Sequence, residues 1–147
     1  MRHTFYRWAL TLALAWGSMA AHAQAVLATD VRAVREVVQA QLKALAADDA
    51  VRAFSYASPT IRTQFGDAAT FMAMIKSGYP MVLRPAATAF FQPEATDSTL
   101  LQVVQVVQLR GRDGRAWLAT YALQRQPDGR WRINGCTVQP DTGKSST

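Results

Sequence analysis

The chain has 147 residues, of which 50% are hydrophobic and 18% charged, and its formal net charge is +6. This length fits one globular domain, and the composition excludes disordered, collagen-like and other low-complexity classes. A single cysteine excludes both an intrachain disulfide framework and a cysteine-rich zinc site.

The first 23 residues have the three parts of a secretory signal peptide. Arg2 and Arg7 give a basic start, residues 8–20 form an apolar run, and Ala-His-Ala at 21–23 supplies small residues around a cleavage site. The apolar run is shorter than the roughly 20 residues that span a bilayer. We therefore expect a Sec-type signal cleaved near Ala23, a periplasmic or secreted protein, and no transmembrane anchor.

Cleavage would change the chemistry open to the protein. Both histidines, His3 and His22, would leave with the signal, so histidine-dependent triads, dyads, general bases and zinc sites are excluded. The remaining chain would carry 14 basic and 10 acidic residues, a net charge of +4. We expect neither a cofactor nor a bound metal.

Apolar residues at helical spacing predict about three helices in the first half. The first begins with Thr29 as its cap and ends near Ala47. A short helix follows Asp48 and Asp49, and Ser58-Pro59 repeats the start signal, since a cap residue precedes proline. Gly66 ends the segment that begins at Ser58. Asp67 then opens a third helix, which ends at Gly78.

From Met81 onward the pattern predicts strands. Short strands are expected at Met81–Leu83 and Ala87–Gln92, and longer ones at Thr99–Arg110, Arg115–Gln126 and Arg130–Val138. The two connectors between the long runs both end in Asp-Gly, which is typical of tight hairpin turns. The long runs should therefore form an antiparallel meander.

The prediction is an α+β protein in which the N-terminal helices pack on a curved, cone-like antiparallel sheet of four to five strands. Residues 24–138 would form one domain, and residues 139–147 a disordered tail. In the run Leu101–Gln108 apolar pairs recur every three residues. Either a bulge near Val103–Val107 restores one buried face, or both faces are covered, for example by a dimer partner. We favour the bulge.

Several segments together resemble a known family. They are residues 54–61 (FSYASPTI), 64–67 (QFGD), 71–74 (FMAM), 78–80 (GYP), 84–85 (RP) and 128–136 (DGRWRINGC). The chain resembles, over about Val31 to Val138, the exported bacterial family called domain of unknown function 4864. The resemblance implies a cone fold similar to the nuclear transport factor two-like, or SnoaL-like, group, with helices packed into a curved sheet around an apolar pocket. Such a fold does not specify an activity.

The favoured function is that of an exported, non-catalytic module with an apolar pocket that binds a small apolar ligand or an envelope protein. Aromatic residues on the predicted strands and helix ends are the candidate ligand-binding residues. They are Tyr56, Tyr79, Trp117, Tyr121 and Trp131. The competing interpretation is that these aromatics form the ordinary core between sheet and helices.

The alternative function is a proton-transfer enzyme of the isomerase or dehydratase type, which needs a carboxylate and a hydroxyl. The long strands contain no Asp or Glu, so the base would come from the helices, with Asp49 and Tyr121 as the catalytic pair. Aspartates at helix starts more commonly serve as caps. Whether the protein is an enzyme stays uncertain, and the sequence favours a non-catalytic module.

The excess positive charge lies in the second half, where Arg110, Arg112 and Arg115 surround one turn and three further arginines surround the next. These arginines would either form a basic surface for an acidic partner or serve only to keep the protein soluble and to protect the edge of the sheet. We expect no nucleic-acid binding. We expect Cys136 to be a small buried residue of a strand and not part of an interchain disulfide, although a homodimer is left open.

Overall fold

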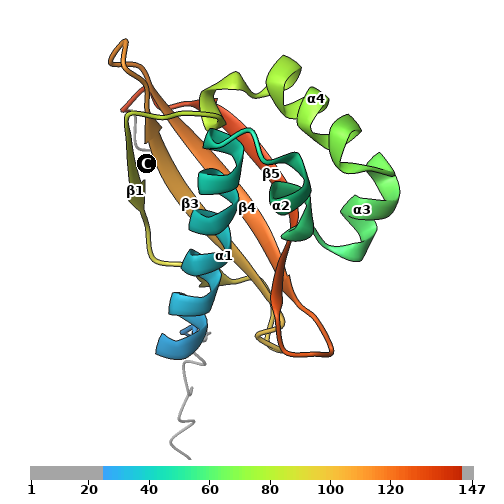
Figure 1. Ribbon diagram of the computed structural model, residues 1–147. Helices are drawn as coiled ribbons and strands as arrows, with labels where there is room; N and C mark the ends of the chain where they lie inside the picture. The colour runs from blue at the N-terminus through green and yellow to red at the C-terminus, as the bar shows by residue number, and fades with distance from the viewer. Residues whose placement is uncertain (1–24, 144–147) are drawn as a thin grey trace, which may run out of the picture.

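Figure 1 shows the computed structural model, which describes residues 25–143; the expected signal peptide therefore lies outside the described residues. Helices precede strands along the chain, and the predicted α+β class is confirmed. The elements in order are α1 (Ala28–Ala46), α2 (Ala50–Ser55), α3 (Pro59–Phe65), α4 (Ala68–Gly78), the 3-10 turn η1 (Pro80–Val82), β1 (Ala87–Phe90), β2 (Glu94–Ala95), β3 (Gln102–Arg110), β4 (Ala116–Arg125) and β5 (Trp131–Pro140).

Three of the helices begin at residues whose side chains cap free backbone N–H groups, as predicted. Asp49 accepts from Arg52 N at 3.1 Å, and Ser58 accepts from Ile61 N at 3.3 Å. Asp67 accepts from the backbone N–H of Thr70 at 2.7 Å in the same way. Polar caps of this kind satisfy donors that have no partner inside the helix.

The start of α1 differs from the prediction. The helix begins at Ala28 after Leu27, without a side-chain cap, and Thr29 lies inside the first turn. Asp30, in the same turn, is only 8% exposed and accepts a hydrogen bond from Trp131 Nε1 at 3.3 Å. This contact ties the first turn of α1 to β5.

The sheet has the strand order β1-β3-β4-β5 with all pairs antiparallel, and β2 pairs with one end of β3. Gly114 and Gly129 have φ of +81° and +84° in the two predicted Asp-Gly turns, a backbone conformation that glycine adopts without strain. The predicted strand at Met81–Leu83 is wrong. Its first residues belong to η1, because Pro80 supplies no N–H for a ladder and starts a tight turn.

The predicted bulge in β3 is also wrong. Pairing with β4 is continuous from Gln102 to Arg110, and alternate residues from Val103 to Leu109 are buried. Gln105 fits among them because its Nε2 donates to the Phe91 carbonyl at 2.7 Å and to that of Val106 at 2.9 Å. Hydrogen bonding thus allows a polar residue on the buried face.

The irregularity lies instead in the pairing of β4 with β5. Ala122 pairs with Gly135, and the next residue, Leu123, pairs with Ile133. Asn134 is the extra residue of β5 at this bulge. β5 continues to Pro140, beyond the predicted domain end at Val138.

The core lies between α1 and one face of the sheet. Val34, Val38, Leu42 and Leu45 form the buried stripe of α1, as their spacing predicts. Figure 1 shows α1 crossing the sheet, whereas α3 and α4 lie on the β5 side.

Candidate functional site

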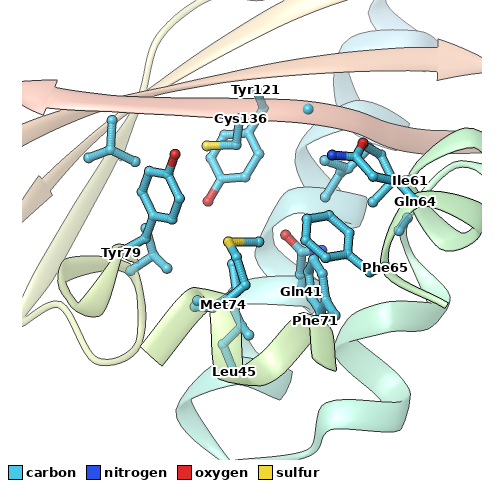
Figure 2. Close-up of a pocket in the computed structure, with 16 residues that line it drawn as sticks. Gln41, Leu45, Ile61, Gln64, Phe65, Phe71, Met74, Tyr79, Tyr121 and Cys136 are labelled. Atoms are coloured by element: carbon cyan, nitrogen blue, oxygen red, sulfur yellow. The ribbon is translucent and has the colours of Figure 1, made fainter. Parts of the chain in front are cut away.

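A cavity of about 220 Å³ lies between the helices and the β4–β5 side of the sheet. Its walls come from segments far apart in the sequence, and most of the lining side chains are apolar (Figure 2). The lining residues are Gln41, Leu45, Ala57, Ile61, Gln64, Phe65, Phe71, Met74, Ile75, Tyr79, Val82, Tyr121, Ile133, Gly135, Cys136 and Val138.

One wall of the cavity depends on how α3 is held. Ser58 is fully buried; its backbone N–H donates to the Ile133 carbonyl at 2.8 Å, and its hydroxyl donates to Asn134 Oδ1 at 2.8 Å. The same hydroxyl accepts from the N–H of Ile61. Ser58 thus joins the start of α3 to the bulge in β5 and positions Ile61 at the cavity.

Aromatic rings stabilise the helical wall. The ring centroid of Phe71 lies 5.3 Å from that of Phe54 and 5.7 Å from that of Phe65, the latter in an edge-to-face arrangement. Such offset pairs are the favoured geometry for aromatic contacts. Phe65 and Phe71 therefore form a fixed apolar surface on this side of the cavity.

The sheet side of the cavity presents Tyr121 and Cys136, which are paired across β4 and β5. Burial raises the pKa of Tyr121 well above its usual value, and the neighbouring Cys136 thiol adds to that shift. Burial also raises the pKa of Cys136 to about 12, partly offset by its hydrogen bond with Tyr121. Both groups are therefore neutral at physiological pH, and the thiol is a poor nucleophile.

A further polar group comes from α1. Gln41 is 5% exposed, and its Nε2 donates to the Ala53 carbonyl at 3.2 Å near the end of α2. A carbonyl can only accept, so this bond fixes the orientation of the amide. The Gln41 oxygen is then free to accept, and Figure 2 shows it on the side of the cavity.

Of the five aromatic candidates, the structure brings only Tyr79 and Tyr121 to the cavity. Tyr56 packs against the core, and Trp131 is 2% exposed and bonded to Asp30. Trp117 lines a separate, open hollow beside the β3–β4 turn. Trp117 and Tyr121 lie at even spacing on β4, but they line different hollows and do not share one site.

The cavity residues that the sequence did not single out are mainly apolar helix residues such as Ile61, Phe65 and Met74. Their helical spacing indicates an inward-facing side, yet the same spacing is typical of a filled core. Only the position of α3 and α4 relative to β5 distinguishes a cavity from a filled core.

The proposed catalytic pair does not meet in the structure. Asp49 is the exposed cap of α2 and is absent from the cavity lining, whereas Tyr121 is buried there. Asp67 caps α4, and Asp48 pairs with Lys76 at 2.7 Å on the surface. The lining contains no Asp, Glu, Lys or Arg, so the geometry gives the Tyr121 hydroxyl no carboxylate partner.

The arginine-bearing turns have local partners. Arg115 lies 3.7 Å from Asp113 of its own turn, and Arg130 lies 3.9 Å from Asp128 of the other. Arg125 reaches Asp30 at 3.6 Å. Exposed pairs like the first two contribute little stability, but they reduce the positive charge that each turn offers to a partner.

The fold and the cavity define an α+β protein with an apolar pocket enclosed between a helical layer and one side of an antiparallel sheet. The chain belongs to the family described as Domain of unknown function (DUF4864), whose model matches residues 27–146. Neither a curated protein nor a solved structure matches the chain.

Two further properties concern residues 25–143 alone. None of the helices in this range is both long enough and apolar enough to cross a membrane. Within the same range, no group of three or more Cys, His, Asp or Glu residues is arranged to hold a metal ion.

Proposed function

We propose that the protein is an exported, non-catalytic module that binds a small apolar molecule in the cavity between α3, α4 and β5. The observation that carries the proposal is the cavity itself, a largely apolar space with a few hydrogen-bonding groups. Binding sites for small molecules typically combine these two features. The resemblance to the nuclear transport factor two-like group, whose cone holds a similar pocket, supports the same function.

Naphthalene is a suitable probe because it is neutral, apolar and rigid. In equilibrium dialysis we expect it to bind the wild-type protein at one site and to raise its melting temperature, because a ligand that binds only the folded state stabilises that state. Ile61→Trp should fill the cavity and weaken binding at least tenfold. Val51→Trp is the matched control, since Val51 is 75% exposed and does not line the cavity.

If Ile61→Trp does not fold, Gln64→Trp at the exposed rim tests the same point. Absence of naphthalene binding to the wild type, or equal binding by the Ile61 and Val51 variants, would overturn the proposal. A module that recognises a protein partner would then be the better description.

Export is the second part of the proposal and rests on the composition of residues 1–23. When the full chain is expressed in a bacterium, the mass of the protein recovered from the periplasm should correspond to a chain that begins at Gln24. Recovery of the uncleaved chain from the cytoplasm alone would contradict it.

A further inference from the structure

Three of the polar groups that line the cavity belong to Tyr79, Tyr121 and Cys136. Tyr121 and Cys136 face the same side of the sheet as register partners on neighbouring strands. Figure 2 shows the hydroxyl of Tyr79, from the segment after α4, pointing toward both of them. Two phenol hydroxyls and one thiol thus lie together in a largely apolar cavity, whose other polar side chains are those of Gln41 and Gln64.

This cluster has unused hydrogen-bonding capacity. Tyr121 is only 2% exposed, and its hydroxyl interacts with the thiol of Cys136. A thiol is a weak donor and a weak acceptor, whereas buried hydroxyls normally have strong partners. Within residues 25–143 the thiol is the partner of the Tyr121 hydroxyl, and an oxygen atom of a bound molecule would be a stronger one.

The lining also determines which charge a ligand can carry. None of its side chains is a carboxylate, an ammonium or a guanidinium group. Transferring an ion from water to such a site is costly, because no opposite charge compensates for the lost hydration. The cavity therefore selects neutral molecules over anions and cations.

The volume limits the size of the ligand. A cavity of about 150 Å³ lined by apolar side chains is known to hold benzene, and pockets for drug-sized ligands have roughly 300–1,000 Å³. The cavity here, at about 220 Å³, lies between these values. It suits a molecule with one or two small rings, or a short branched chain.

We propose that the ligand is a neutral compound with a compact apolar body and one hydroxyl or carbonyl oxygen, and that the hydroxyls of Tyr79 and Tyr121 bind this oxygen. This inference rests on the proposed function and specifies the class of ligand. Tyr121 fixes the position of the oxygen from the sheet, and Tyr79 closes over it from the helical side. Phe65, Phe71 and Met74 contact the apolar body.

Three probes of similar shape test the inference: naphthalene, 2-naphthol and 2-naphthoate. Dissociation constants at pH 7 would be measured by equilibrium dialysis with the full chain. We expect 2-naphthol to bind roughly three- to tenfold more tightly than naphthalene, the effect of about one net hydrogen bond. The naphthoate anion should bind at least tenfold more weakly than the neutral alcohol.

The variants Tyr121→Phe and Tyr79→Phe keep the rings and remove only the hydroxyls. In each variant the advantage of 2-naphthol over naphthalene should shrink, and in the double variant it should vanish, while the affinity for naphthalene stays the same. Tyr56→Phe is the matched control, because Tyr56 packs against the core outside the cavity. That variant should retain the full advantage.

The outcomes separate this inference from the proposed function. If naphthalene and 2-naphthol bind equally, or if the Tyr121 and Tyr79 variants retain the preference, the assignment of the hydroxyls is wrong although the cavity still binds apolar molecules. Tighter binding of 2-naphthoate than of 2-naphthol would refute the selection for neutral ligands. If no probe binds, the proposed function itself fails.

Discussion

Ser58 gives the sharpest test of how the cavity is built, because one hydroxyl has two separate roles. It caps α3 through Ile61 N and donates to Asn134 Oδ1 at the β5 bulge. Replacing Ser58 with Ala removes the cap, which costs about 1 kcal/mol. It also removes a partly buried hydrogen bond worth about 1 kcal/mol.

We therefore expect Ser58→Ala to lower the free energy of unfolding by about 2 kcal/mol. With an unfolding entropy of about 2.1 cal/mol/K per residue, a domain of this size loses roughly 4 °C of melting temperature per kcal/mol. The melting temperature should then fall by about 8 °C. Urea unfolding followed by circular dichroism measures the free energy, and a thermal scan measures the temperature shift.

Asp49→Ala is the control, because Asp49 caps α2 at the surface and has no cross-link to the sheet. It should cost about 1 kcal/mol, the effect of a cap alone. A double-mutant cycle of Ser58→Ala with Asn134→Ala should give a coupling free energy of about 1 kcal/mol. Equal losses for the Ser58 and Asp49 variants, or no coupling, would refute the dual role of Ser58.

Other expectations concern the core and the partly buried thiol of Cys136. Leu109 of β3 is fully buried, whereas Leu101, which precedes that strand, is 50% exposed. Leu109→Ala should therefore cost about 2–5 kcal/mol and Leu101→Ala much less, as measured by urea unfolding; similar losses would contradict this difference in burial. The folded pKa of Cys136 is raised from 9.0 to about 12, so its neutral thiol contributes stability that is fully present below pH 9 and is lost as pH rises toward 12. The loss of stability between pH 9 and 11 should be smaller in Cys136→Ala than in the wild type. Iodoacetamide should modify the native thiol far more slowly than the denatured one at pH 8, and rapid native modification would contradict the partly buried, neutral state.

Local sequence features determined most of the secondary structure, because caps and turns depend on a few adjacent residues. The starts of α2, α3 and α4 follow from Asp49, Ser58 and Asp67, and the two hairpins follow from their Asp-Gly turns. The order of helices before strands, and hence the α+β class, could be predicted in the same way. The predicted bounds of the long strands also placed every Asp and Glu outside them, and the structure agrees.

Tertiary contacts decided what local patterns left open. Gln105 is polar, and only its bonds to the Phe91 and Val106 carbonyls keep it on the buried face, so a bulge inferred from the pattern was unnecessary. The real bulge lies in β5 at Asn134, next to Ser58, which is 76 residues away in the sequence. Such a contact leaves no periodic signal in either segment.

The cavity also results from contacts between segments that are distant in the sequence. The helical spacing of Phe71, Met74 and Ile75 indicates an inward face, but spacing alone does not distinguish a packed interior from a space beside it. The placement of α3 and α4 next to β5, fixed in part by Ser58, leaves the cavity and brings Tyr79 near Tyr121. The sequence by itself thus determined most of the elements and the inward side of the helices. Only the packing of those elements decided that Tyr79 and Tyr121 share one pocket, because that depends on distances between segments and not on the order of residues within them.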